Sequence, residues 1–113
     1  MNSKRKGSGG ERELAELLQA HGYDAHRNDQ RYIGGLNNPD VGGLPGYHIE
    51  VKRTERFNLY EAMQQAQHDA DGKAVPIVCH RRNRHPWVVV MTLEDFLNLE
   101  GRKEAAHAQR TEP

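Results

Sequence analysis

The sequence lacks the features that would place the chain in a membrane or in a disulfide-stabilised scaffold. One cysteine among 113 residues excludes an intrachain disulfide and suits a reducing cytoplasm. The longest apolar run, 87–91, falls far short of the ~20 residues that cross a bilayer. The basic start, 1–6, leads into glycines and charges where a secretory signal would need an apolar segment, so we expect no such signal. These absences predict a cytoplasmic chain with no membrane partner.

A net charge of one sign is also missing, because 16 Lys and Arg balance 16 Asp and Glu. A nucleic-acid binder usually carries a clear positive excess, so the neutral total counts against a chain that is basic throughout. The bases are nevertheless gathered in four clusters, at 4–6, 27–31, 52–56 and 81–84. This uneven distribution allows one basic face on a neutral protein.

The length predicts a single domain. A chain of 113 residues is large enough for one modest core and too small for two. We expect a flexible basic arm over 1–7, the domain over 8–99 and a polar C-terminal tail over 100–113. The first helix is expected to begin at Ser8 and to end at Gly22, because Ser8-Gly9-Gly10-Glu11 has the spacing of a capping box.

The remaining elements follow from alternating apolar residues, caps and turns. Strands are predicted over 23–27, 40–42, 47–53, 75–79 and 87–91, and further helices over 58–72 and 92–99. The resulting order is one helix, three strands, one helix, two strands and one helix (αβββαββα). This order predicts an α/β fold with a mixed central sheet flanked by helices.

A hairpin within this order brings acidic residues together. If its turn is centred near Pro45, an antiparallel pairing joins positions whose numbers sum to about 90, so Asp40 lies opposite Glu50. Residues directly opposite share a face of the sheet, with side chains ~5 Å apart. Lys52 follows Glu50 at the two-residue period of a strand and points to the same face.

Two acids and an amine on one face suit metal-assisted hydrolysis of a phosphodiester. Asp40 and Glu50 supply the hard oxygen ligands that Mg²⁺ prefers, and the carbonyl of Val51 is near enough to be a third protein ligand. Such an ion lowers the pKa of bound water and neutralises charge on the phosphate. Lys52 would orient or help deprotonate the attacking water and stabilise the transition state.

Each of these residues also has a plainer explanation. Pro39-Asp40 is a common turn former, and a polar strand face is frequently only solvated. The joint register of Asp40, Glu50 and Lys52 favours the site. Glu11 stays open between helix cap and site residue, with the spacing alone favouring the cap. His48 adjoins the acidic face, where we interpret it as a bystander.

Three blocks of the sequence resemble the PD-(D/E)xK nuclease superfamily, and most closely its archaeal-type and phage Holliday-junction resolvases. The blocks are Lys6–Leu14, Pro39–Val41 and Ile49–Lys52, which occur in the order typical of that superfamily. The resemblance implies a restriction-endonuclease-like fold and an endonuclease that uses Mg²⁺, for which Mn²⁺ substitutes. It implies the active-site roles of Asp40, Glu50 and Lys52, and it moves Glu11 from cap to metal and catalytic site.

The resemblance also implies DNA as the partner. It places Arg27 in a region that contacts DNA and favours phosphate contact over a merely solvated tip for the basic loop at 81–84. The residues expected to bind DNA are Lys4, Arg5, Lys6, Arg27, Arg53, Arg81, Arg82 and Arg84. For the arm at 4–6, steering of DNA and simple solubilisation stay open.

The preferred substrate by resemblance is a four-way junction, cut by a homodimer with Trp87 or the second helix among its contacts. The expected setting is the cytoplasm of a bacterial or phage-infected cell. Two alternatives stay open: a less selective or restriction-like endonuclease, and a catalytically silent DNA-binding module of the same fold. The complete set of Asp40, Glu50 and Lys52 argues against the silent module.

Overall fold

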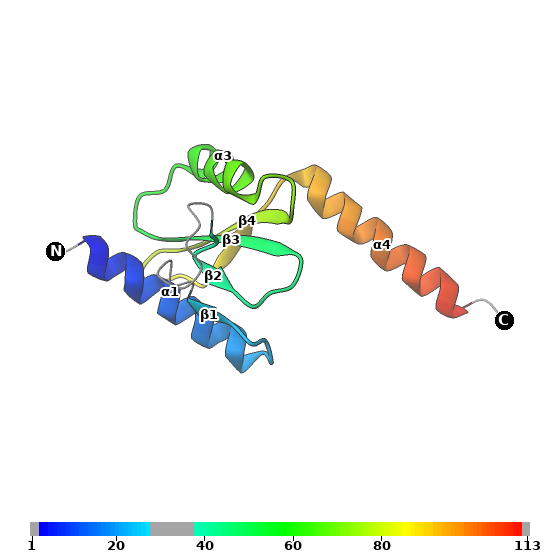
Figure 1. Ribbon diagram of the computed structural model, residues 1–113, viewed down its shortest axis with the longest axis horizontal. Coiled ribbons are helices and arrows are strands. Elements are labelled where there is room, and N and C mark those ends of the chain that lie inside the picture. The colour runs from blue at the N-terminus through cyan, green and yellow to red at the C-terminus, as the bar shows by residue number, and fades with distance from the viewer. Residues whose placement is uncertain (1–2, 28–37, 112–113) are drawn as a thin grey trace.

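A five-stranded mixed sheet forms the centre of the molecule (Figure 1). The computed structural model describes the backbone of residues 3–27 and 38–111 and the side chains of residues 9–27 and 38–106. The strands lie in the order β1 (His26–Arg27), β2 (Val41–Gly42), β3 (Tyr47–Arg53), β4 (Val75–Arg81) and β5 (Val88–Val90). Only β3 and β4 are parallel, and the other three pairs are antiparallel. The predicted α/β class, mixed sheet and element order are confirmed.

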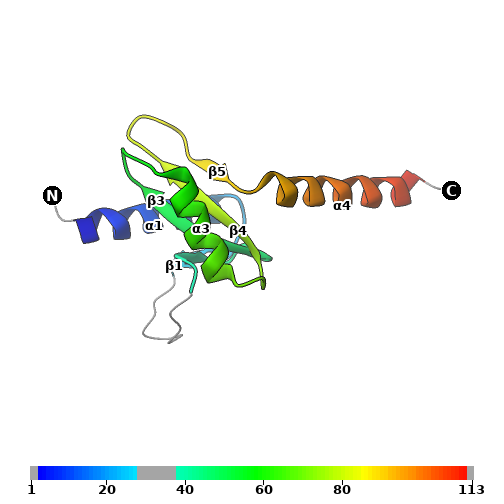
Figure 2. The same cartoon turned by 90° about the horizontal axis from the view of Figure 1, so that it is seen from above.

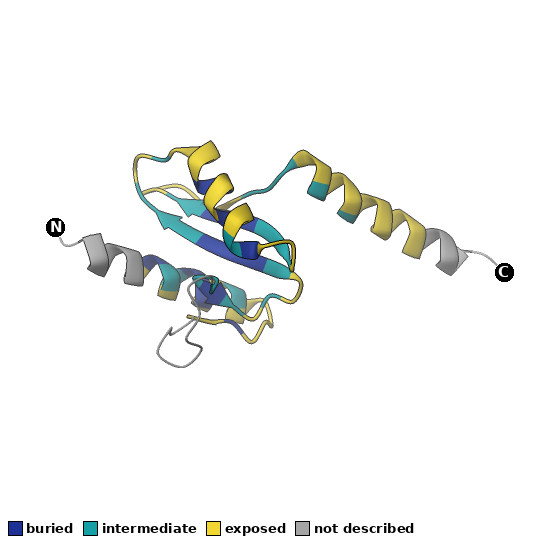
Figure 3. Cartoon of the chain, turned by 45° about the horizontal axis from the view of Figure 1, so that its top comes forward, coloured by how far each residue is buried: buried dark blue, intermediate teal, exposed yellow. Residues whose placement is uncertain are grey.

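Two helices cover opposite faces of the sheet (Figures 2 and 3). On one face, α1 (Ser3–Ala20) packs Leu14 and Ala15 against Ile49, Ile77 and their buried neighbours. On the other, α3 (Leu59–Ala70) packs its small apolar residues around Val78. Because strand side chains alternate between faces, Glu50 points toward α3, as Val78, its partner on β4, does.

The turn between β2 and β3 has the predicted register. Val41 pairs with Ile49, so the paired positions sum to 90 and Asp40 stands opposite Glu50. Two glycines with positive φ make the tight turn possible, Gly43 at 101° and Gly46 at 85°. Gly43 also lies against the backbone of Asp24, so a side chain there would collide with the segment leading into β1.

The caps of α3 and of the last helix are as predicted. The side chain of Asn58 accepts a hydrogen bond from the backbone N–H of Glu61 at 3.1 Å, and Thr92 Oγ1 accepts one from Asp95 N at 3.1 Å. The helix α3 ends at Ala70, and Asp71 takes the left-handed conformation of a C-cap. This is one residue before Gly72, where the predicted helix ends.

Two helices are longer than predicted. The capping-box interpretation is wrong, because α1 already begins at Ser3 and Glu11 therefore lies inside the helix. The close packing of Gly10 against Arg53 shows how tertiary contact overrides the low helix propensity of glycine. At the other end, α4 (Leu93–Thr111) continues past the expected end at 99, since its Ala, Glu, Lys and Arg residues are strong helix formers. The proposed division into arm, domain and tail stays a prediction.

The last helix leaves the body of the molecule and runs away from the sheet (Figure 1). It accounts for a long axis of 60 Å against 32 and 29 Å for the other two. Within the described residues, no helix is both long and apolar enough to cross a membrane.

Candidate active site

The hairpin joins Asp40 and Glu50 directly. The backbone N–H of Asp40 donates to the carbonyl of Ile49 at 2.8 Å, and Asp40 Oδ2 accepts from the N–H of Val51 at 2.8 Å. The charge of Asp40 and a side-chain hydrogen bond from it both raise the pKa of Glu50, so the two carboxyl groups lie close together. Two carboxyl groups this close repel each other when both are ionised, and a proton or a cation between them relieves that repulsion.

Glu50 is the acid that holds the proton. It is only 3% exposed, and burial first, then the charge and hydrogen bond of Asp40, raise its pKa to about 9. A hydrogen bond to Asp69 and the charge of Asp69 act in the same direction. A buried acid surrounded by other acids stays neutral at pH 7 unless a cation replaces its proton.

Two residues that the sequence analysis did not assign to the site complete the surroundings of Glu50. His48 is 5% exposed, and its Nε2 lies 3.1 Å from Glu50 Oε1. One ligand atom each from His48, Glu50 and Asp69 fall within 4.8 Å of one another, so these three side chains could hold a metal ion. Burial lowers the pKa of His48, opposed by the charges of Asp69 and Asp40, and the neutral imidazole is a form that binds metals.

His48 was predicted to be a bystander, but it lies beside Glu50 and could share a metal ion with it. Asp69 was not predicted to belong to the site. A signal for Asp69 was present, because it follows Ala62 and Ala66 on the buried face of α3, where an acid is unusual. The rotation of α3 against β3 brings that acid over Glu50, and spacing along the chain does not predict this rotation.

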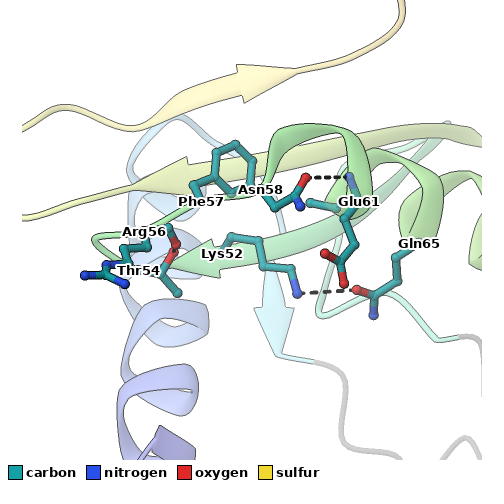
Figure 4. Close-up of a pocket in the computed structure, with 8 residues that line it drawn as sticks. Lys52, Thr54, Arg56, Phe57, Asn58, Glu61 and Gln65 are labelled. Atoms are coloured by element: carbon teal, nitrogen blue, oxygen red, sulfur yellow. Dashed lines mark hydrogen bonds between the residues drawn. The ribbon is translucent and has the colours of Figure 1, made fainter.

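Lys52 borders a pocket of about 250 Å³ between β3 and the start of α3 (Figure 4). Its Nζ donates a hydrogen bond to Oε1 of Gln65 at 3.3 Å. The pocket is lined by Lys52, Thr54, Arg56, Phe57, Asn58, Glu61, Ala62 and Gln65. Gln65 is exposed on α3 and contacts the lysine of the predicted site.

Glu11 lies on α1, on the opposite face of the sheet, near enough to Asp40 for the charge of that acid to act on it. Burial and the charge of Asp40 raise its pKa, while the hydrogen bond and charge of Arg27 lower it. Arg27 Nε donates to Glu11 Oε1 at 3.2 Å. Glu11 is therefore not a helix cap. It has two charged neighbours: Arg27, which donates a hydrogen bond to it, and Asp40, whose negative charge acts on it.

The predicted DNA-binding arginines divide into two groups. Arg53 donates to Glu13 at 3.3 Å and to Asn83 Oδ1 at 3.0 Å, and Arg81 also pairs with Glu13. These contacts tie α1 to the ends of β3 and β4. Arg82, by contrast, is exposed in the loop after β4, as is Arg84, which has a positive φ of 69°.

The remaining residues considered in the sequence are the three bases near the N-terminus, Val51 and Cys79. The side chains of Lys4, Arg5 and Lys6 lie outside the described residues. Val51 gives its N–H to Asp40 and packs its side chain against the core, so only its carbonyl is left as a metal ligand. Cys79 is buried on β4 on the same face as Ile77, and burial raises the pKa of its thiol to about 11.

Comparison with known proteins identifies the family and the fold. The profile of the phage putative PDDEXK endonuclease family matches residues 2–112. Among solved structures, the chain is similar to Hjc, a Holliday junction resolvase from the archaeal hyperthermophile Archaeoglobus fulgidus, with a TM-score of 0.55 and 24% identity over 72% of each chain. No curated protein sequence matches the chain. The predicted superfamily and its fold are confirmed.

Proposed function

Since the chain belongs to the phage putative PDDEXK endonuclease family, we propose that it hydrolyses DNA phosphodiesters with the help of Mg²⁺ held by Asp40 and Glu50. The observation that supports the proposal is the register of the hairpin, which sets Asp40 opposite the buried Glu50, with Asp40 Oδ2 bonded to the N–H of Val51. This donor set fits Mg²⁺, which prefers one or two carboxylates together with water and phosphate oxygens.

Glu11 and the Val51 carbonyl are proposed as further oxygen ligands. When bound, the ion would lower the pKa of a water and neutralise charge on the scissile phosphate. Mn²⁺ accepts the same oxygen donors and is expected to substitute. His48 and Asp69 could contribute to a second ion position that shares Glu50.

Lys52 is proposed to act on the attacking water. Hydrolysis forms a bond from the water oxygen to phosphorus and breaks the bond to the leaving sugar oxygen, which takes up a proton. Lys52 would orient or help deprotonate the water and stabilise the charge that develops on the phosphoryl oxygens. Its hydrogen bond to Gln65 supports this role, since it restricts where the flexible side chain points.

The proposed substrate is branched DNA, with a four-way junction as the first choice and a homodimer as the active form. The similarity to a protein described as a Holliday junction resolvase supports this choice. The exposed Arg82 and Arg84 supply phosphate contacts, to which Arg27 and the basic residues at 4–6 are added by prediction. A two-fold symmetric dimer would place two active sites on the two strands that must be cut.

A cleavage assay tests the chemistry. Purified protein is incubated with Mg²⁺ and labelled four-way junction, fork or linear duplex, and cuts are mapped on denaturing gels. Asp40→Asn and Lys52→Ala should each lower cleavage by at least about 100-fold, as expected for residues that act on the transition state. Asp71→Asn and Lys73→Ala, exposed residues beyond the end of α3, are the matched controls and should cut normally.

The assay also decides among the alternatives. Cleavage of junctions alone supports a resolvase, whereas equal cleavage of linear DNA supports a less selective or restriction-like endonuclease. Binding without any cleavage supports a silent DNA-binding module. Unchanged cleavage by Asp40→Asn and Lys52→Ala would contradict the assigned chemistry.

A further inference from the structure

The helix α4 and the strand before it expose apolar residues that nothing in the described part of the chain covers. Val88 and Val89 at the free edge of β5 and Leu93, Phe96 and Leu97 on α4 are 46% to 70% exposed; we call these five residues the α4 patch. In the described part of the helix, Asp95 and Leu99 are half-buried, while its other side chains through Ala106 are exposed. An isolated helix is marginal in water, so an apolar face of this kind needs a partner.

Small residues sit where a partner helix could approach closely. Leu93, Leu97, Gly101 and Ala105 follow one another at intervals of four and form one ridge of the helix. Gly101 lies near the middle of Leu93–Thr111, and a Cβ added there would meet nothing within 4 Å. A glycine inside a helix weakens it, and a close backbone approach is a physical reason for placing one there.

The charges along α4 favour a second copy in the opposite direction. The half 93–100 contains three acids, Glu94, Asp95 and Glu100, and no base. The half 101–111 contains the bases Arg102, Lys103 and Arg110 against the single acid Glu104. In an antiparallel pair, the acidic half of one helix lies beside the basic half of the other, whereas a parallel pair would set like charges together.

We propose that the α4 patch and the α4 ridge form the surface on which a second copy of this chain docks, with the two α4 helices antiparallel and crossing near Gly101. The interface specifies the homodimer proposed above and rests on that assembly. It does not depend on the nuclease chemistry, because every residue of the surface lies outside the candidate active site.

Sedimentation equilibrium of the full chain tests the surface. We expect the 12.9 kDa chain to reach twice its mass at micromolar concentration. Leu97→Gln and Gly101→Gln should each raise the dissociation constant of the dimer by roughly tenfold or more, as for the central residues of an interface. Asn98→Gln, at an exposed position off the ridge, is the matched control and should leave it unchanged. A wild-type chain that is monomeric at about 100 μM, or variants that dimerise normally, would overturn the proposal.

Disulfide trapping tests the direction. Each residue of a helix rises ~1.5 Å, and a disulfide needs Cα atoms within ~7 Å. In an antiparallel pair crossing near Gly101, Gly101→Cys should therefore cross-link two copies on oxidation, whereas Leu93→Cys should not. The wild type, with its buried Cys79, controls for native thiol reaction. Cross-linking of both variants would show a parallel pair. Cross-linking of neither variant would show that the chains associate through a different interface. Either result would contradict the proposal.

These readouts separate the dimer from the enzyme. A dimer that passes both tests but cuts no DNA would preserve the surface and remove the proposed activity. An active nuclease that stays monomeric would preserve the proposed activity and remove the dimer surface.

Discussion

The carboxylate of Asp40 accepts a 2.8 Å hydrogen bond from the backbone N–H of Val51, one residue beyond the acid that Asp40 faces. The bond fixes the side chain of Asp40 against β3, so both carboxyl groups of the candidate metal site are held by the same strand. A metal ligand that is oriented before the ion arrives loses less conformational freedom when it binds.

This bond separates two effects of changing Asp40. Asp40→Asn keeps an oxygen that can accept from Val51, whereas Asp40→Ala leaves a partly buried N–H without its partner. We expect both variants to lose cleavage, but only Asp40→Ala to lose about 1–3 kcal/mol of unfolding free energy relative to Asp40→Asn. Urea denaturation at pH 7 measures the difference, and equal stabilities would show that the bond contributes nothing to the fold.

The raised pKa of Glu50 predicts a pH-dependent stability. Between its usual pKa of 4.5 and about 9, the folded state keeps a proton that the unfolded state has released. Without a metal ion, stability should therefore fall as pH rises, by at most about 1.4 kcal/mol per pH unit. Measurements over pH 7–8.5 keep the contribution of Glu50 apart from those of His48 and Cys79. The lowered pKa of His48 changes stability only below its usual value of 6.5, and the raised pKa of Cys79 changes stability only from about pH 9.

Denaturation of metal-free protein across that range measures the slope. Glu50→Gln, which cannot ionise, should flatten it. Because a cation displaces the proton of Glu50, added Mg²⁺ should raise the melting temperature more at pH 8.5 than at pH 7. A Glu50→Gln variant with the wild-type slope would assign the proton to another group.

The contact between Lys52 and Gln65 predicts a catalytic effect without a binding effect. Gln65→Ala removes the acceptor that orients the lysine, so the single-turnover cleavage rate should fall roughly tenfold, within the range for a hydrogen bond to a charged group. Affinity for DNA, measured in Ca²⁺ to prevent cleavage, should stay within about twofold. Gln64→Ala changes an exposed neighbour on the same helix and should leave both quantities unchanged.

The two groups of arginines should respond differently to truncation. Arg53, whose side chain is 16% exposed and bonded to Glu13, supports the fold, so Arg53→Ala should cost about 1–3 kcal/mol of stability. Arg82→Ala should change stability by less than about 0.5 kcal/mol. It should instead weaken DNA binding and lower the steepness of its salt dependence by about one unit. Normal DNA affinity in Arg82→Ala would remove that loop from the interface.

The hairpin shows how far local sequence rules reach. Turn residues between 42 and 47 and alternation along 47–53 together predict the register Val41 to Ile49, because a slip of one residue would turn Ile49 to the wrong face. The same rules predict the observed limits of β3 and the Asn58 cap of α3. These features depend on neighbours along the chain, and they were predicted correctly.

Two of the misses depend on contacts between distant elements. The position of Asp69 over Glu50 follows from how α3 rotates on the sheet, and the bond of Lys52 to Gln65 from how far the helix extends along β3. The polar residues after Leu99 predict a solvated segment equally well as coil or as helix. The high helix propensity of these residues favours the helix.

The start of α1 provides a matched test of tertiary packing, because Gly9 and Gly10 are adjacent and differ in surroundings. A Cβ at Gly9 would meet nothing within 4 Å, so Gly9→Ala should stabilise the helix by about 0.5–1 kcal/mol. A Cβ at Gly10 would collide with the side chain of Arg53, so Gly10→Ala should force α1 off β3 and cost about 1–3 kcal/mol.

The same pair of variants reports on the candidate active site. Glu11 directly follows Gly10, and the field of Asp40 already acts on it. A displaced α1 would carry Glu11 away from Asp40, so Gly10→Ala should lower Mg²⁺-dependent cleavage even where the protein is fully folded, while Gly9→Ala should not. Thermal denaturation and cleavage at a temperature well below both melting points measure the two effects separately. If Gly10→Ala were as stable and as active as Gly9→Ala, α1 would not rest on Arg53 and would not deliver Glu11 to the site.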